Sequence, residues 1–276
     1  MTAPVGRLSF SLNHHRSQLH ESHHATQSHN SALTGVAILT TGTALLLPAA
    51  AHAQNASVPC TESALVTAVT SANAAGGGTV TLTPGCTYTL TASHGDDGVN
   101  GPAGLPIITT PITLDGNANT IARSAAAPAF RIAQVGPTGG TTLKAITFSG
   151  GQAVTTGHND GGGILNFGAV TLTGSQLSGN TAGGRGGALY STGTPAATTF
   201  TSSTVKNNTA NQSAGIASVN GTLTLTSSVV NTNTATVNPG GIYYVAGSAS
   251  LNTSTVTANT PTNCVSSPSP VPGCIG

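Results

Sequence analysis

Apolar and polar residues alternate in short segments through the second half of the chain. The clearest are 222–226, which reads Thr-Leu-Thr-Leu-Thr, and 170–173, which reads Val-Thr-Leu-Thr. A period of two residues is typical of a β-strand with one buried face. A parallel sheet covered by helices on both sides would instead show nearly continuous aliphatic runs. The alternation therefore predicts strands that leave one face in solvent.

The same segments recur at a nearly constant step. Equivalent apolar residues are separated by 28, 25 and 26 positions: Leu172, Phe200, Leu225 and Leu251. A period of this length is typical of stacked supersecondary units. Roughly 26 residues suffice for three short strands and three turns, so each unit should form one coil that adds about 4.8 Å to a stack. The pattern predicts an all-β fold, a single-stranded parallel β-helix (β-solenoid) with these apolar residues in one interior column.

Two further motifs keep this step. One asparagine recurs in each unit: Asn180, Asn208, Asn233 and Asn259. Glycine pairs before an apolar residue recur at Gly161, Gly186 and Gly240. We expect the asparagines to form a structural ladder, with side-chain amides bonding to neighbouring coils. The glycines are expected at tight corners and not around a phosphate, because no Lys-Ser/Thr completes a nucleotide motif.

The N-terminal part divides into a leader and a cap. An apolar stretch over 33–50 ends in Ala51-His52-Ala53, which is typical of a secretory cleavage site. We expect 1–53 to be a leader with a signal peptide and 54–276 to be the β-helix domain. Within it, 54–76 is the N-terminal cap, with a helix that starts at Thr61, and 261–276 is a disulfide-bearing tail. An uncleaved membrane anchor is the alternative, but Thr, Gly and Pro interrupt the stretch.

These repeats resemble those of a known class of proteins. They are similar to secreted bacterial right-handed parallel β-helix proteins of pectin-lyase-like architecture. The Gly-Gly-Ala-Leu phrase at 186–189 and the Leu-x-x-Asn phrase at 177–180 also resemble repeats of polymorphic outer-membrane proteins. The resemblance covers about 59–276 and implies a right-handed coil. Many unrelated functions occur on this fold, so it implies architecture before activity.

Cysteines and charge limit the chemistry. The four cysteines all follow the leader, and an even count in an exported chain indicates two disulfides. Three pairings are possible, and position along the chain favours Cys60–Cys86 and Cys264–Cys274. Their spacing does not fit a zinc site, and neither a metal nor another cofactor is expected. Five acidic and five basic residues balance after residue 53, which disfavours nucleic acid as a partner.

An extracellular polysaccharide lyase or glycoside hydrolase is the enzymatic alternative. Proton abstraction beside a uronate needs a strong base near a cation or near carboxylates that bind Ca²⁺, and hydrolysis needs two positioned carboxylates. The candidates are Asp97, Asp160 and Arg131, which are far apart in the sequence. Because no acidic cluster accompanies them, catalysis is the second hypothesis, and Ca²⁺ is expected only under it.

Two other groups of residues, tyrosines and threonines, are candidates for binding functions. Tyr190 and Tyr243 lie two coils apart at equivalent positions and are candidates for sugar binding, although surface packing explains them as well. Outward-facing threonines on successive coils suggest ice binding as a third function, and ordinary β-propensity explains the same enrichment. Our leading hypothesis is a noncatalytic scaffold that is adhesive or glycan-binding, with polysaccharides or cell-surface components as partners. It would be extracellular, either released or associated with the cell surface, and not inserted in a membrane after cleavage; the oligomeric state stays open.

Overall fold

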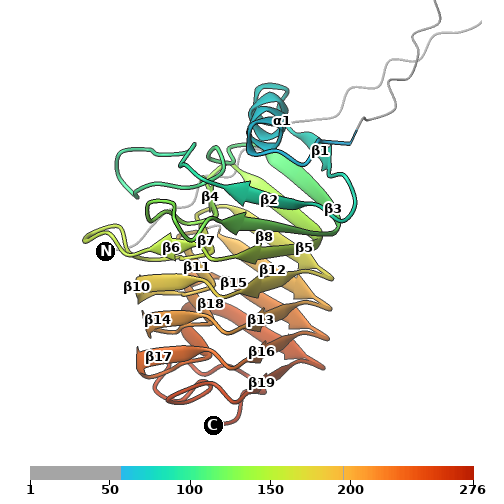
Figure 1. Cartoon of the computed structure of the whole chain (residues 1–276). Coiled ribbons are helices and arrows are strands. Elements are labelled where there is room, and N and C mark those ends of the chain that lie inside the picture. Colours follow the sequence, from blue (N-terminus) through green and yellow to red (C-terminus); the bar gives the residue numbers. More distant parts are fainter. Residues whose placement is uncertain (1–56, 195) are drawn as a thin grey trace, which may run out of the picture. The chain divides into compact units, whose positions relative to one another are not determined.

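The computed structural model describes residues 57–276 except Pro195, and these residues form a parallel β-solenoid (Figure 1). The leader and signal peptide expected in 1–53 lie outside the described residues. Strands of successive coils pair in parallel, in one sheet of 15 strands and a second sheet of 4. The all-β parallel solenoid predicted from the repeats is therefore confirmed, and its one helix lies near the N-terminal side.

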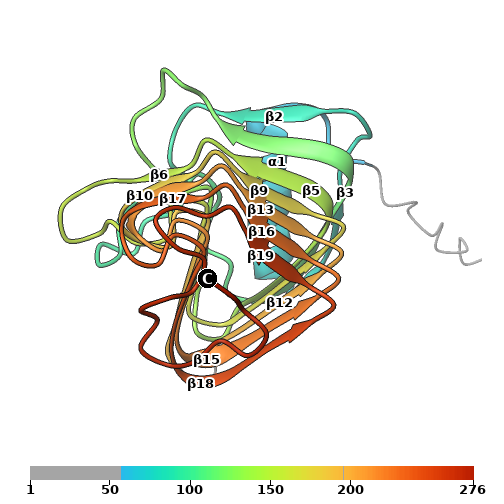
Figure 2. The ribbon, with the colours of Figure 1, turned by 90° about the horizontal axis from the view of Figure 1, so that it is seen from below.

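Four stacks of strands follow one another around the coils (Figure 2). The first stack contains β1 (Gly78–Thr81), the first part of β3 (Pro111–Arg123), the first part of β5 (Gly140–Ser149), β8 (Ala169–Thr173), β12 (Ala197–Thr201), and the last parts of β15 (Ile216–Thr226) and β18 (Ile242–Asn252). The second stack contains β2 (Thr87–Leu90), the last parts of β3 and β5, β9 (Gln176–Ser178), β13 (Thr204–Lys206), β16 (Val229–Asn231) and β19 (Thr255–Thr257).

The remaining two stacks close each coil. The small sheet comes next along the chain and contains β6 (Gln152–Ala153), β10 (Thr181–Arg185), β14 (Thr209–Gln212) and β17 (Thr234–Val237). The third stack of the large sheet follows it, with β4 (Ala133–Val135), β7 (Ile164–Asn166), β11 (Leu189–Thr192) and the first parts of β15 and β18.

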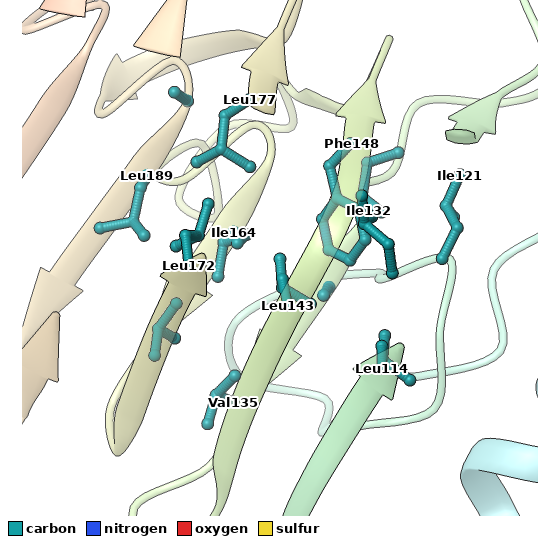
Figure 3. Close-up of a cluster of buried hydrophobic side chains, with 14 of the residues drawn as sticks. Leu114, Ile121, Ile132, Val135, Leu143, Phe148, Ile164, Leu172, Leu177 and Leu189 are labelled. Carbon is teal, nitrogen blue, oxygen red and sulfur yellow. The ribbon is translucent and has the colours of Figure 1, made fainter. Parts of the chain in front are cut away.

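Apolar side chains fill the interior in columns that run along the stack (Figure 3). The predicted column is confirmed, because the strand register places its members above one another: Val80, Leu114, Leu143, Leu172, Phe200, Leu225 and Leu251. All but the last are at most 5% exposed, and Leu251 is partly buried. A second column lies behind the second stack: Tyr88, Ile121, Phe148, Leu177, Val205, Val230 and Val256. Burial of these columns is the main stabilising contribution to the solenoid.

The repeated asparagines form a buried ladder at the corner between the second stack and the small sheet. The Nδ2 of Asn180 donates to Oδ1 of Asn208 at 3.0 Å, and equivalent bonds join Asn208 to Asn233 at 2.9 Å and Asn233 to Asn259 at 2.8 Å. The ladder ends in the C-terminal tail, where Asn259 donates to Oδ1 of Asn263 at 3.0 Å. These amides satisfy buried turn backbone that the strands do not pair.

The sequence analysis did not predict a second ladder, which serines form at the corner between the first and second stacks. Backbone N–H groups donate to the serine Oγ one coil below, from Ser175 to Ser203 at 3.1 Å, from Ser203 to Ser228 at 3.1 Å and from Ser228 to Ser254 at 3.0 Å. Each serine stands five positions before its asparagine and keeps the same step. The signal was therefore present, but serine is common in turns and did not stand out.

The glycine pairs lie where the backbones of successive coils approach closely. A Cβ at Gly187 would lie 2.5 Å from the carbonyl oxygen of Thr209 and 2.6 Å from that of Ala214. Real Cβ atoms do not approach oxygens this closely, so only glycine fits without a backbone shift. The second glycine of the pair is thus required by close packing against the small sheet.

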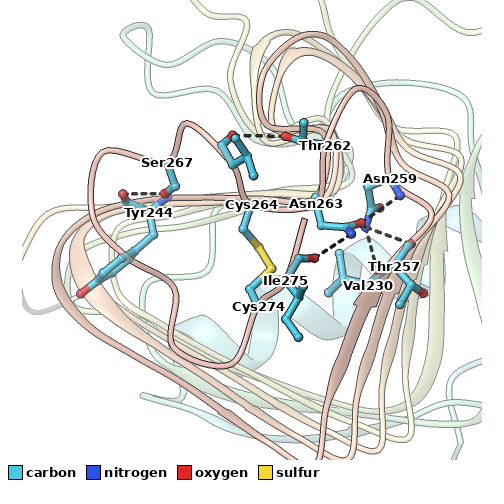
Figure 4. The surroundings of a disulfide bond; sticks show 12 residues. Val230, Tyr244, Thr257, Asn259, Thr262, Asn263, Cys264, Ser267, Cys274 and Ile275 are labelled. Atoms are coloured by element: carbon cyan, nitrogen blue, oxygen red, sulfur yellow. Dashed lines mark hydrogen bonds between the residues drawn. A yellow bond between two sulfur atoms is a disulfide. The ribbon is translucent and has the colours of Figure 1, made fainter.

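Both ends of the solenoid are covered. Helix α1 (Glu62–Ala74) buries Leu65 and Val69, and its N-cap Thr61 accepts a hydrogen bond from the Ala64 N–H at 3.3 Å. At the other end, the tail folds across the last coil, where the Cys264–Cys274 disulfide and Asn263 lie (Figure 4). The second disulfide joins Cys60 to Cys86 beside the N-terminal cap. Two disulfides are typical of a protein in an oxidising, extracellular environment.

Candidate ligand-binding site

Two long loops fold over the outer surface of the third stack. The first, 93–104, follows β2 and is closed by an antiparallel bridge between Gly95 and Ala103. The second, 154–163, precedes β7. The loops meet at Gly101, which has φ +81° and whose added Cβ would lie 2.8 Å from the Cβ of His158. Glycine is required here both by the left-handed backbone and by the close contact.

A pocket of about 200 Å³ lies between these loops and the strands β7 and β11. It brings together three of the sequence candidates, Arg131, Asp160 and Tyr190, which come from different coils. Its other walls include Asn100, His158 and Phe167. The pocket thus combines aromatic rings, amides, a carboxylate and a guanidinium in one small space.

Arg131 forms the buried floor of the pocket, with only 1% of the residue exposed. Its guanidinium donates to the carbonyl oxygens of Gly101 at 2.8 Å, His158 at 3.2 Å and Asp160 at 3.3 Å, and so ties the two loops together. Burial lowers its pKa to about 10, although nearby carboxylates act in the opposite direction, so the group stays protonated at neutral pH. Its Nε–H has no hydrogen-bond partner within the described part of the chain.

Asp97 lies outside the pocket and is fully engaged. Its Oδ1 accepts from the N–H groups of Val99 at 3.0 Å and Asn100 at 2.7 Å, and its Oδ2 accepts from the amides of Asn100 at 2.7 Å and Gln134 at 2.6 Å. Burial opposes its ionisation, but these hydrogen bonds outweigh burial and hold the pKa of the carboxyl well below its usual range. Asp97 therefore orders its loop and is a poor proton acceptor.

Asp160 and Tyr190 are linked through Arg185. The Oδ1 of Asp160 accepts from the Arg185 N–H at 2.6 Å, and its Oδ2 lies 3.5 Å from the guanidinium. The same guanidinium lies over the Tyr190 ring at 4.9 Å from its centroid. Tyr190 is only 8% exposed and packs with Leu165 and Ala217, so it is a packing residue, as the alternative had it, but a buried one. Arg185 therefore fixes the positions of the Tyr190 ring and the Asp160 carboxylate at the wall of the pocket.

Tyr243 shares the outward-facing column of Tyr190, with Ala217 between them. It is partly buried beside Leu165, Phe167 and Val219 but does not line the pocket. The two tyrosines therefore belong to one apolar strip on the third stack and not to one binding site.

The described residues contain no group of three or more His, Cys, Asp or Glu side chains that could hold a metal ion. Over the same residues, no helix is long and apolar enough to cross a membrane. Comparison with protein-family models, with curated proteins and with solved structures finds no match to this chain.

Proposed function

We propose that this protein is a secreted, noncatalytic β-solenoid scaffold that binds a neutral carbohydrate in the pocket beside Tyr190. The convergence of Arg131, Asp160 and Tyr190 from separate coils is the observation that carries the proposal. Sugars are recognised by aromatic faces together with polar side chains that bond to hydroxyls, and Phe167, Asn100 and Asp160 supply both. The right-handed, pectin-lyase-like architecture and the export signal suggested by the sequence are consistent with an extracellular glycan as partner.

The charges of the site favour a neutral ligand. Arg131 and Arg185 are opposed by Asp97 and Asp160, and Asp96 of the same loop adds one more negative charge, so the surroundings of the pocket carry no positive excess that would attract an anionic sugar. The cleavage alternative has less support, because both oxygens of Asp97 are engaged in hydrogen bonds and both oxygens of Asp160 face Arg185.

A glycan array followed by calorimetry tests this proposal. We expect binding of neutral glycans, a marked loss of affinity in Tyr190→Ala and Asp160→Asn, and retention in Tyr190→Phe, which keeps the ring. Tyr243→Ala is the matched control, since it lies in the same column outside the pocket. The same samples are incubated with uronic-acid polymers with and without Ca²⁺. Cleavage abolished by Asp160→Ala, or binding unaffected by Tyr190→Ala, would refute the proposal.

A further inference from the structure

The outer surface of the first stack carries threonine throughout two neighbouring outward columns of three consecutive coils, while the third outward column reads Ala169, Ala197 and Thr222. The register sets Thr171, Thr199 and Thr224 side by side in one column and Thr173, Thr201 and Thr226 in the next. These six residues are called the threonine face below. The first column continues above through Thr142, Thr113 and Thr79 and ends below at Ser250.

The backbone holds this array in a fixed lattice. Neighbouring threonines are about 4.8 Å apart between coils and about 6.6 Å apart along a strand. The residue between each pair, Leu172, Phe200 or Leu225, is fully buried in the core. The serine ladder fixes the far end of each strand, since Ser175 donates to the carbonyl of Thr173 at 3.0 Å and Ser203 to that of Thr201 at 2.8 Å.

The hydroxyl groups of the threonine face are free for a ligand. None of the six hydroxyl groups makes a hydrogen bond with another described residue, because the serine ladder bonds only to their backbone carbonyls, whereas the hydroxyl of the nearby Thr222 accepts from Ser248. No charged or aromatic side chain stands among them. In the second column the face ends above at Lys144 and Asp115. Beside the first column, a hollow of about 400 Å³ over Gly140 and Ala169 is lined by Thr113, Thr142 and Thr171.

Strand propensity alone does not explain this uniformity. The second stack belongs to the same coils and has the same demand for β-forming residues. Its equivalent outward positions are mixed: Gln176, Thr204 and Val229 in one column and Ser178, Lys206 and Asn231 in the next. Two adjacent columns made of threonine alone are therefore found on the first stack and not on the second.

We infer that the threonine face binds the ordered water lattice of ice. Its ligand must be uncharged and must repeat in two dimensions at the spacings of the sheet, and the oxygen rows of ice have similar spacings. Each threonine presents a hydroxyl that bonds to a lattice water and a methyl group that orders the water beside it. A sugar polymer would instead call for aromatic platforms, which this face lacks.

Ice-crystal growth and thermal hysteresis of the full chain test this inference. We expect faceted crystals and a measurable hysteresis gap, both lost in Thr199→Lys at the centre of the face. Thr204→Lys is the matched control, because Thr204 has the same partial exposure in the same coil but lies on the second stack. Retained circular dichroism and melting temperature show that both variants are folded. Wild-type protein that leaves crystals as rounded discs without hysteresis, or equal loss in both variants, overturns the inference, and neither result depends on the sugar pocket.

Discussion

Each asparagine of the ladder bonds to several groups that have no partner in the strands. The Oδ1 of Asn208 accepts from the backbone N–H of Asn180 at 2.9 Å and from its side chain at 3.0 Å. Its Nδ2 donates to the carbonyl oxygens of Leu177 at 3.1 Å and Lys206 at 2.9 Å. Asn208 is 1% exposed, so no bulk water replaces these bonds when the amide is removed. A buried polar group left without a partner costs more than an average hydrogen bond contributes.

Asn208→Ala should therefore lower the free energy of unfolding by about 2–4 kcal/mol, since at least two buried groups lose their partners. Denaturant unfolding followed by circular dichroism measures the change. Asn252→Ala is the control, because Asn252 is exposed and should change stability by no more than about 0.5 kcal/mol. Equal effects in the two variants would show that the ladder contributes little to stability.

Among the elements, helix α1 is attached to the first coils by one carboxylate. Glu62 accepts hydrogen bonds from the N–H groups of Thr91 at 2.9 Å and Ala92 at 3.1 Å and from the hydroxyl of Thr91 at 2.5 Å, and it lies 2.9 Å from Nε2 of His94. Burial opposes its ionisation, but these bonds outweigh burial and lower its pKa to about 2. The ionised carboxylate therefore stabilises the attachment of the helix.

This attachment should weaken in acid. A carboxyl group whose pKa is lower in the folded state contributes its full stability above its ordinary pKa, and the contribution is lost as the pH falls toward the folded value. For Glu62 this window runs from 4.5 down to about 2. Melting temperatures measured across that range should fall less steeply in Glu62→Gln than in the wild type, with Asp97 accounting for part of the remaining slope. Asp115→Asn is the control, and identical slopes in wild type and Glu62→Gln would contradict the prediction.

The elements differ in how far the sequence predicts them. The column of Leu172, Phe200 and Leu225 was predictable because the interior demands the same kind of residue once per coil. The hydrogen bonds of the buried Asn166 were not predictable. Its side chain donates to the hydroxyls of Ser191 at 3.0 Å and Thr198 at 3.3 Å, but no repeated motif marks these residues. The pocket was also hidden: Asp160 and Arg131 were recognised singly, but loops of irregular length bring them together.

In the whole molecule, the stability of each coil depends on the coils stacked on either side of it. Each coil contacts mainly its two neighbours, so a solenoid behaves as a one-dimensional chain of units with a cap at each end. The α1 helix covers one end, and the tail stapled by Cys264–Cys274 covers the other (Figures 1 and 2). A defect in one coil should therefore loosen the coils between it and the nearer end before it affects the distant ones.

Leu225→Asp tests this property, because it places a charge at a fully buried position of the interior column. Without a partner, the charge should destabilise the protein by about 4 kcal/mol or more. Hydrogen exchange should show the loss first in β15, β18 and β19, while β3 and β5 keep their protection. Thr224→Asp is the matched control, since its side chain lies on the outer face of the same strand. Uniform loss of protection from β1 to β19 would mean that the coils unfold as one cooperative unit, and native melting in Leu225→Asp would mean that the interior accepts a charge at this position.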